Sequence, residues 1–240
     1  MTTNNNFASE QYEQDARWTA VDAYAMSHCH PSSRPNTKAL ENALTASKAA
    51  GLPDISASPA QGKFMALMCR MLGVEHALEV GTLGGYSAIW LCSENPQLRL
   101  TTVEYNARNA EVARKNIEFA GLSDRIEVIN GAGLDVLPRL KEEVLAGERP
   151  RFGFVFIDAD KPNNWNYFSL AADMAKPKAA ICVDNVVRRG KVADFSIDDP
   201  RVVGGRTVIE NAGKDPRVDS VVIQSVGEKN YDGCLWAVLN

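Results

Sequence analysis

The sequence lacks several features that mark other classes of protein. No apolar run in its 240 residues approaches the roughly 20 residues that a membrane-spanning helix needs, and the start, MTTNNNFASEQYEQD, has no basic and apolar export signal. The net charge is −4, with lysine and arginine scattered among acids instead of forming a basic stripe. These absences predict a cytoplasmic protein that acts on neither membranes nor nucleic acids.

Cysteine is scarce and internal repeats are absent. The five cysteines are odd in number, widely spaced and mostly inside apolar patterns, so we expect reduced core residues and no disulfide framework: Cys29, Cys69, Cys92, Cys182 and Cys234. The apolar content of 45% is enough for a substantial core in one domain, or in one domain plus a lid.

The pattern along the chain alternates between helical periodicity and short strand-like runs, which favours a mostly parallel α/β sheet. Strands are expected near residues 77–80, 99–104, 125–130, 152–158 and 179–184. Helices are expected between them, near residues 85–93, 107–120, 133–146 and 163–175. Two late runs, VDSVVIQSV and GCLWAVL, are separated by GEKNYD and indicate a long hairpin.

Two more helices are expected before the first strand. One spans residues 36–50, and the other begins at Pro59 after the capping residue Ser58. The apolar stripe of the second helix is expected to face the core: Phe64, Leu67, Met68, Met71 and Leu72.

Acidic residues follow two of the apolar strands. The run FVFI leads into Asp158, and ICV leads into Asp184 and Asn185. An unpaired buried carboxylate is costly, so the set indicates a hard divalent cation with open positions for substrate oxygens. The alternative is that the two acids merely cap the helices that follow.

A glycine-containing turn, in ALEVGTLGGYSAIWLC (77–92), joins the first of these strands to a helix. Its glycines, Gly81, Gly84 and Gly85, fit neither the GxGxxG fingerprint of a dinucleotide site nor a GK[ST] phosphate loop. Glu104 ends the next strand, where an acid accepts hydrogen bonds from ribose hydroxyls. The pattern favours a nucleoside without a diphosphate and argues against a dinucleotide-dependent oxidoreductase.

Together these motifs resemble the cation-dependent S-adenosylmethionine O-methyltransferases of the catechol and caffeoyl-CoA type. The matching segments are PAQGKF (59–64), LEVGTLGGYS (78–87), TTVEYN (101–106), FIDADK (156–161) and DNVVRRGKV (184–192). The resemblance implies a Rossmann-like class I methyltransferase, whose mostly parallel seven-stranded sheet has a reversed last strand and helices on both faces. It also implies a helical lid over the acceptor in residues 1–58, a methyltransferase domain in residues 59–240, and a homodimer.

The resemblance assigns site residues by position. Eight would contact S-adenosylmethionine or lie against it: Ser58, Glu79, Gly81, Ser87, Glu104, Gly133, Asp158 and Asp160. Asp158, Asp184 and Asn185 would hold Mg²⁺, or Mn²⁺ or Ca²⁺ on the same oxygens. Asp158 would therefore serve both sites.

The expected reaction is methyl transfer to one hydroxyl of a vicinal dihydroxy aromatic, such as a catechol, a flavonoid or a phenolic acid. Chelation of both hydroxyls by the cation would lower their pKa and aim one oxygen at the methyl group. Lys161, three residues after Asp158, is the candidate general base, as the resemblance also implies; the alternative is a solvated surface charge. A noncatalytic or differently specialised protein that keeps the cofactor site is the other reading.

Several other residues near these motifs have two readings. Asp160 either orients a ligand or caps a helix, and Trp165 and Tyr167 either line an aromatic pocket or, as we favour, lie in the core. His28 and His30 form an H-x-H pair with no second ligand cluster, so we favour a mobile lid over a zinc site there.

The acceptor pocket departs from the family pattern at one place. Many relatives carry an aromatic residue shortly after the Asp-Asn pair, where this chain has Arg188 and Arg189. The arginines make a more polar acceptor possible, with a carboxylate, a sulfate or a CoA phosphate as its anionic group, although exposed arginines beside acids such as Asp194 are usually only solvated.

Overall fold

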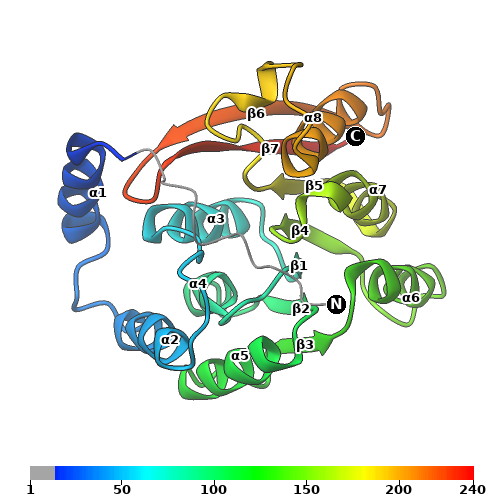
Figure 1. Cartoon of the computed structure of the whole chain (residues 1–240). Coiled ribbons are helices and arrows are strands. Elements are labelled where there is room, and N and C mark those ends of the chain that lie inside the picture. The colour runs from blue at the N-terminus through cyan, green and yellow to red at the C-terminus, as the bar shows by residue number, and fades with distance from the viewer. Residues whose placement is uncertain (1–13) are drawn as a thin grey trace.

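A seven-stranded sheet forms the centre of the computed structural model, which describes residues 14–240 (Figure 1). Residues 1–13, where the expected lid segment begins, lie outside the described part of the chain. The strands are β1 (His76–Val80), β2 (Arg99–Glu104), β3 (Ile126–Asn130), β4 (Phe152–Ile157), β5 (Ala175–Val183), β6 (Val218–Val226) and β7 (Tyr231–Leu239).

The strand order is β3-β2-β1-β4-β5-β7-β6. The pairs from β3 to β5 are parallel, and β7 is antiparallel to both of its neighbours, β5 and β6. The mostly parallel seven-stranded sheet with a reversed last strand is therefore confirmed, as is the C-terminal hairpin.

Helices surround this sheet, most of them close to the predicted places. They are α1 (Ala16–Cys29), α2 (Thr37–Ala49), α3 (Pro59–Met71), α4 (Tyr86–Glu94), α5 (Ala107–Phe119), α6 (Gly133–Leu145), α7 (Asn164–Met174) and α8 (Pro200–Ala212), with short 3-10 turns at η2 (Lys161–Asn163) and η3 (Lys191–Ala193). No helix in residues 14–240 is long and apolar enough to cross a membrane.

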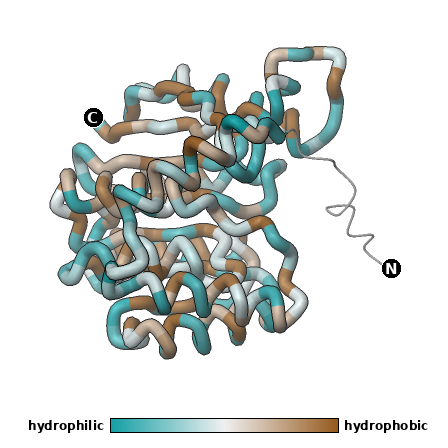
Figure 2. The backbone as a smooth tube through the Cα atoms, turned by 90° about the vertical axis from the view of Figure 1, so that its left-hand side faces the viewer, coloured by the Kyte–Doolittle hydropathy of each residue, from teal (hydrophilic) through white to brown (hydrophobic). Residues whose placement is uncertain are grey.

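Successive residues of the central strands pack against different helices. On β4, Phe154 and Phe156 belong to a buried cluster with α3, α4 and α5, whereas Val155 and Ile157 belong to a cluster with α6, α7 and α8. Because neighbouring strand residues point to opposite faces, the two clusters lie on the two faces of the sheet. Helices on both faces are thus confirmed, and in Figure 2 the outer helices alternate between hydrophobic and hydrophilic residues.

The expected orientation of α3 is wrong. Phe64 is 48% exposed and Met71 is 79% exposed, while the buried residues of the helix include Lys63, Met65 and Cys69. Gly62 packs directly on the ring of Trp90, where any side chain would collide, so this close contact with α4 sets which face turns inward. The apolar stripe of α3 therefore lies on the surface of the chain.

Helix α8 was not expected from the sequence. Its segment, PRVVGGRTVIENA, has two adjacent glycines and several β-branched residues, which are poor helix formers. The signal that could have found it is Asp199 before Pro200, because the Asp199 carboxylate accepts a hydrogen bond from the backbone N–H of Arg201 at 2.8 Å.

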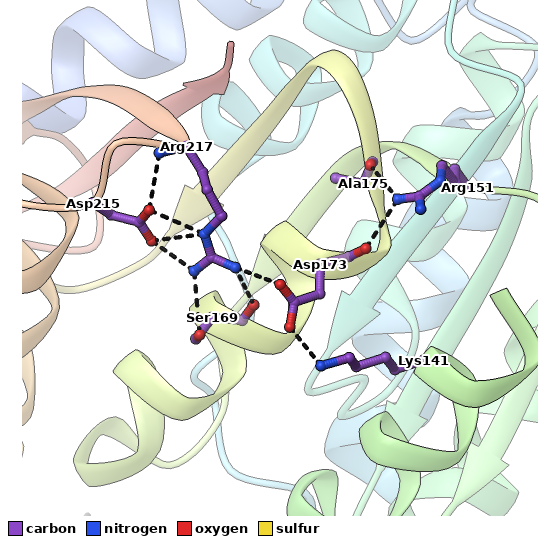
Figure 3. Close-up of polar contacts among 7 residues, drawn as sticks. All are labelled: Lys141, Arg151, Ser169, Asp173, Ala175, Asp215 and Arg217. Atoms are coloured by element: carbon purple, nitrogen blue, oxygen red, sulfur yellow. Dashed lines mark hydrogen bonds and ion pairs between the residues drawn. The ribbon is translucent and has the colours of Figure 1, made fainter. Parts of the chain in front are cut away.

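A cluster of charged residues ties α6, α7 and the start of β6 together (Figure 3). The Asp173 carboxylate pairs with Lys141 at 2.7 Å and with Arg217 at 2.5 Å, and Arg217 also pairs with Asp215 at 2.6 Å. Arg151 donates to the backbone carbonyl of Asp173. The cluster fixes the end of α7 against its neighbours and is structural.

The cysteines and the paired histidines occupy ordinary structural positions. All five cysteines are free thiols, with Cys69, Cys92 and Cys182 buried and Cys29 exposed. The imidazole of His28 lies 2.8 Å from the backbone carbonyl of Tyr24, and His30 is buried beside Trp90. The reduced state is as predicted, and mobility of the segment around the histidines stays a prediction.

Candidate active site

A cleft of about 770 Å³ runs along the edge of the sheet where the parallel strands end. Eight predicted site residues line it: Gly81, Ser87, Glu104, Gly133, Asp158, Asp160, Lys161 and Asn185. The other three, Ser58, Glu79 and Asp184, lie beside or beneath the lining. The strand order places Glu104, Gly81, Asp158 and Asn185 in that sequence along the cleft, with strands about 4.8 Å apart.

The turn after β1 has the backbone conformation that glycine permits. Gly81 has a φ of 99° and lies against the backbone carbonyl of Asp158, so a side chain there would collide with β4. Gly85, with a φ of 80°, stands at the start of α4. The predicted turn after β1 therefore lines the cleft beside the end of β4.

Glu104 is fixed by the backbone of two loops. Its carboxylate accepts hydrogen bonds from the N–H groups of Thr82 at 3.1 Å, Leu83 at 2.8 Å and Asn106 at 2.9 Å. These bonds hold the acid rigidly at the cleft wall, at the tip of β2. The position fits an acceptor for hydroxyl groups of a ligand in this end of the cleft.

Glu79 and Ser58 support the site from outside the lining. Glu79 is fully buried and accepts hydrogen bonds from the hydroxyls of Ser87 at 2.5 Å and Thr102 at 2.6 Å. Burial raises the pKa of Glu79 to about 7. Ser58 caps α3 by accepting from the N–H of Gln61 at 3.2 Å, next to residues 56–57, which do line the cleft.

Lys161 and Asp158 form a close ion pair on the cleft floor. The Nζ atom of Lys161 lies 2.5 Å from Oδ1 of Asp158, and the lysine side chain is 11% exposed. Burial alone would lower the pKa of Lys161, but the negative charges of Asp158 and Asp184 outweigh it and raise that pKa. The reading of Lys161 as a solvated surface charge is therefore wrong.

Asp184 and Asn185 follow β5, next to Asp158 at the end of β4. Asp184 is 6% exposed, and its Oδ1 accepts hydrogen bonds from the N–H of Asn185 at 2.8 Å and the thiol of Cys234 at 3.2 Å. Burial, and then the charge of Asp158, raise the pKa of Asp184 to about 6. Asn185 has a left-handed φ of 55°, which asparagine tolerates better than most residues.

The donor set fits a hard divalent cation. One buried carboxylate, Asp184, one half-buried carboxylate, Asp158, and an amide oxygen are the kind of ligands that such a cation prefers. Residues 14–240 contain no group of three or more His, Cys, Asp or Glu suited to a metal, so this set depends on the amide as its third donor. Neither Asp158 nor Asp184 caps the first turn of a helix, so the capping alternative fails.

Asp160 holds the segment that follows the ion pair. Its carboxylate accepts hydrogen bonds from the hydroxyl of Tyr167 and from the side-chain amide of Asn163, both at 2.5 Å. Asp160 does not cap η2 with its side chain. Tyr167 is buried as expected and also lines the cleft, whereas Trp165 stacks on Phe168.

The sequence reasoning missed two parts of the cleft. Asp232, at the start of β7, is buried and accepts hydrogen bonds from the N–H groups of Val187 at 3.1 Å and Arg188 at 2.9 Å. Arg201, on α8, also lines the cleft. The sequence signal that could have identified Asp232 is an acidic residue between GEKNY and GCLW, at the start of the last predicted strand. No sequence signal pointed to Arg201, because its helix was not expected.

Comparison with known proteins decides the family. The family model described as O-methyltransferase matches residues 30–230. The chain belongs to the O-methyltransferase family. The curated O-methyltransferase imqG of Aspergillus flavus is 53% identical to this O-methyltransferase over 240 residues, covering 99% of the chain and 97% of the relative.

Two further relatives support the assignment. The catechol O-methyltransferase of Mycobacterium tuberculosis is 45% identical over 202 residues, covering 84% of this chain and 88% of its own. The structure of the Bacillus cereus O-methyltransferase in complex with SAH has a TM-score of 0.87 and 43% identity, covering 93% of this chain and 99% of that one. The O-methyltransferase is thus an enzyme with a Rossmann-like methyltransferase fold, and the dinucleotide oxidoreductase reading is excluded.

Proposed function

We propose that this O-methyltransferase moves the methyl group of S-adenosylmethionine to one hydroxyl of a vicinal dihydroxy aromatic, with a divalent cation. The observation that carries the proposal is the group of Asp158, Lys161, Asp184 and Asn185 at the cleft, of which Asp184 is buried and the other three are half-buried. The names of relatives, which include catechol O-methyltransferases, and the SAH complex of the Bacillus cereus enzyme support the acceptor class and the methyl donor.

The cation would be held by Asp158, Asp184 and Asn185, with Mg²⁺ as the expected ion and Mn²⁺ or Ca²⁺ as alternatives for the same oxygens. When bound, such an ion lowers the pKa of the hydroxyls that it contacts. Asp158 and Asp184 supply the negative charge, and Asn185 adds a neutral oxygen without further repulsion. The thiol of Cys234 donates a hydrogen bond to the Asp184 carboxylate and helps to orient it.

Lys161 is the proposed general base, accepting the hydroxyl proton at Nζ. The charges of Asp158 and Asp184 are what raise its pKa in the structure. Once those charges are compensated, burial and then the charge of Arg188 are the remaining influences, and both lower the pKa of Lys161 toward the range in which it accepts a proton.

The methyl donor is expected at the end of the cleft over β1 and β2. Glu104 has the fixed carboxylate for the ribose hydroxyls, and Gly81 and Gly133 also line the cleft. Glu79 would act indirectly, by holding Ser87 at the start of α4.

The decisive experiment measures methylated product by mass spectrometry. The purified enzyme receives S-adenosylmethionine and a panel of catechols with matched monohydroxy phenols, in Mg²⁺ or in EDTA. Methylation that requires both the diol and the cation supports the proposal. Methylation of monophenols that EDTA leaves unchanged contradicts it, as does a lack of product from every catechol.

We also propose that residues 1–58 cover the acceptor. Residues 55–57 line the cleft, and the loop that carries them is tied down by an ion pair of 2.8 Å between Asp54 and Lys229. The carboxylate of Asp22, on α1, accepts a hydrogen bond from the N–H of Glu228 at 2.7 Å. These contacts join the N-terminal segment to the turn between β6 and β7 beside the cleft.

A homodimer is proposed through one apolar face of the chain, formed by α3 and the adjoining surface of β6 and β7. Phe64 and Met71 are exposed on α3, and the ring of Phe64 lies edge-on to Trp236 with a centroid distance of 5.2 Å. Val221 and Ile223 of β6 are 54% and 52% exposed on the same side of the sheet as Trp236. A second copy would cover the stripe that the sequence pattern marks for burial.

A further inference from the structure

Arg188 lies three residues after Asn185, on the loop that follows β5. It lines the cleft, is half-buried and has a left-handed φ of 53°, as does its neighbour Arg189, with a φ of 59°. This conformation costs about 1–2 kcal/mol per non-glycine residue, so other contacts must maintain it. The Asp232 carboxylate does so by accepting the backbone N–H of Arg188 at 2.9 Å.

The guanidinium of Arg188 has no hydrogen bond and no ion pair with any residue in the described range 14–240. Its neighbour across the cleft differs, because Arg201 pairs with Asp199 at 2.7 Å. The charge of Arg188 is felt inside the site, where it is one of the influences that lower the pKa of Lys161 against the raising effect of Asp158. The charge of Arg188 also favours the ionised forms of Asp232 and Asp199, so part of it is balanced within the protein. Because neither carboxylate forms an ion pair with the guanidinium within residues 14–240, the guanidinium can still pair with the anion of a ligand.

The strand order indicates where that anion would come from. Asp158 and Asn185 follow β4 and β5, the cofactor end of the cleft lies over β1 and β2, and Arg188 lies on the opposite side, toward β7. An aromatic ring with its hydroxyls at Asp158 and Asn185 would have its other end away from the methyl donor, on the side of Arg188.

Helix α8 closes the same end of the cleft. Gly204 packs against the backbone carbonyl of Lys161, and Gly205 packs against that of Val186, so neither position has room for a side chain. This contact fixes the start of α8 beside the loop that carries Arg188. The arginine therefore lies between two rigid elements, which limits the entropy lost when it binds a ligand.

We propose that Arg188 determines acceptor specificity by binding a carboxylate on the dihydroxy aromatic ring. The inference rests on the proposed function and narrows it to acceptors that are aromatic acids. A guanidinium and a carboxylate form two parallel charged hydrogen bonds, an interaction that neither an aromatic residue nor a lysine at this position would reproduce.

The test compares 3,4-dihydroxybenzoate with its uncharged methyl ester as acceptors for the native enzyme, R188M and R189M. Methionine is unbranched, so each variant keeps an apolar stem in place of the arginine's methylene groups and removes the guanidinium without adding β-branching at a left-handed residue. The ratio of kcat/KM for the acid to that for the ester should be about tenfold or more in the native enzyme. It should fall close to one in R188M and remain near the native value in R189M.

The outcomes separate the two proposals. If the native enzyme methylates both compounds with equal kcat/KM, or if R188M keeps the preference for the acid, the role of Arg188 is wrong while the proposed function stands. If R189M loses the preference for the acid as completely as R188M does, the role of Arg188 is also wrong, because the preference would then depend on the charge of the whole loop. If neither compound, nor any other catechol, is methylated, the proposed function itself fails.

Discussion

The Nζ atom of Lys161 lies 2.5 Å from Oδ1 of Asp158. Asp158 directly follows β4, and Lys161 is the first residue of η2. The pair joins the proposed base to a proposed cation ligand, and the charge of Asp158 favours the protonated form of Lys161. A lysine that only neutralised an acid would be replaceable by another cation, whereas a base must also lose its proton.

Replacing Lys161 by arginine separates these two roles. Arginine keeps the positive charge beside Asp158 but does not lose its proton in a protein. We expect K161R and K161M both to lower kcat by about 10²–10⁴-fold, the usual contribution of a general base. Steady-state kinetics on a catechol measures this. Near-native kcat in K161R would assign Lys161 to charge balance alone, and K176M, which changes a lysine outside the cleft, serves as control.

Removing one carboxylate tests the cation site directly. D184N keeps the size of the side chain and the oxygen but removes the negative charge, so the affinity for divalent cations should fall by at least about tenfold. Calorimetric titration of Mn²⁺ into the protein measures this without any turnover. D199N is the matched control, because Asp199 pairs with Arg201 at the rim of the cleft. Equal Mn²⁺ affinities for native protein and D184N would contradict the assignment.

The positions of the main site residues could be predicted because parallel strands end at one edge of a sheet. Asp158, Asp184, Asn185 and Glu104 each lie at the end of an apolar run, so the continuous apolar runs were enough to place them at one edge of the sheet. Their partners were harder to foresee. The contact of Cys234 with Asp184 joins residues 50 apart in the chain, and only the reversed direction of β7 creates it.

The wrong orientation of α3 has a different cause. Helical periodicity shows that a helix has an apolar stripe, but it does not say whether that stripe meets the core of the same chain. In α3 the inward face is set by Gly62 against Trp90, and the inward-facing Lys63 is satisfied by Glu94 at 3.0 Å. The sequence pattern could not distinguish burial in the core from burial by a second chain.

Glu79 predicts a pH dependence of stability. Its pKa is about 7 in the folded protein against 4.5 in its ordinary state, so the folded protein binds more protons between these values. The contribution of Glu79 therefore lowers the free energy of unfolding as pH rises from 4.5 through 7, by an amount on the order of 3 kcal/mol. In E79Q this part of the pH dependence should disappear. Urea unfolding at pH 5 and pH 8 measures it, and identical pH dependences for native protein and E79Q would refute the claim.

The apolar face predicts which surface changes alter the oligomeric state. A lysine at Met71 or at Ile223 would place a charge on the apolar face that also carries Phe64, Val221 and Trp236, where a second copy would have to desolvate it. We expect M71K and I223K to be monomers in light scattering coupled to size-exclusion chromatography, at concentrations where the native chain is a dimer. L145K is the matched control, because Leu145 is an exposed apolar residue at the end of α6, outside this face. A monomeric native chain, or dimers in both variants, would show that the dimer uses no part of this face.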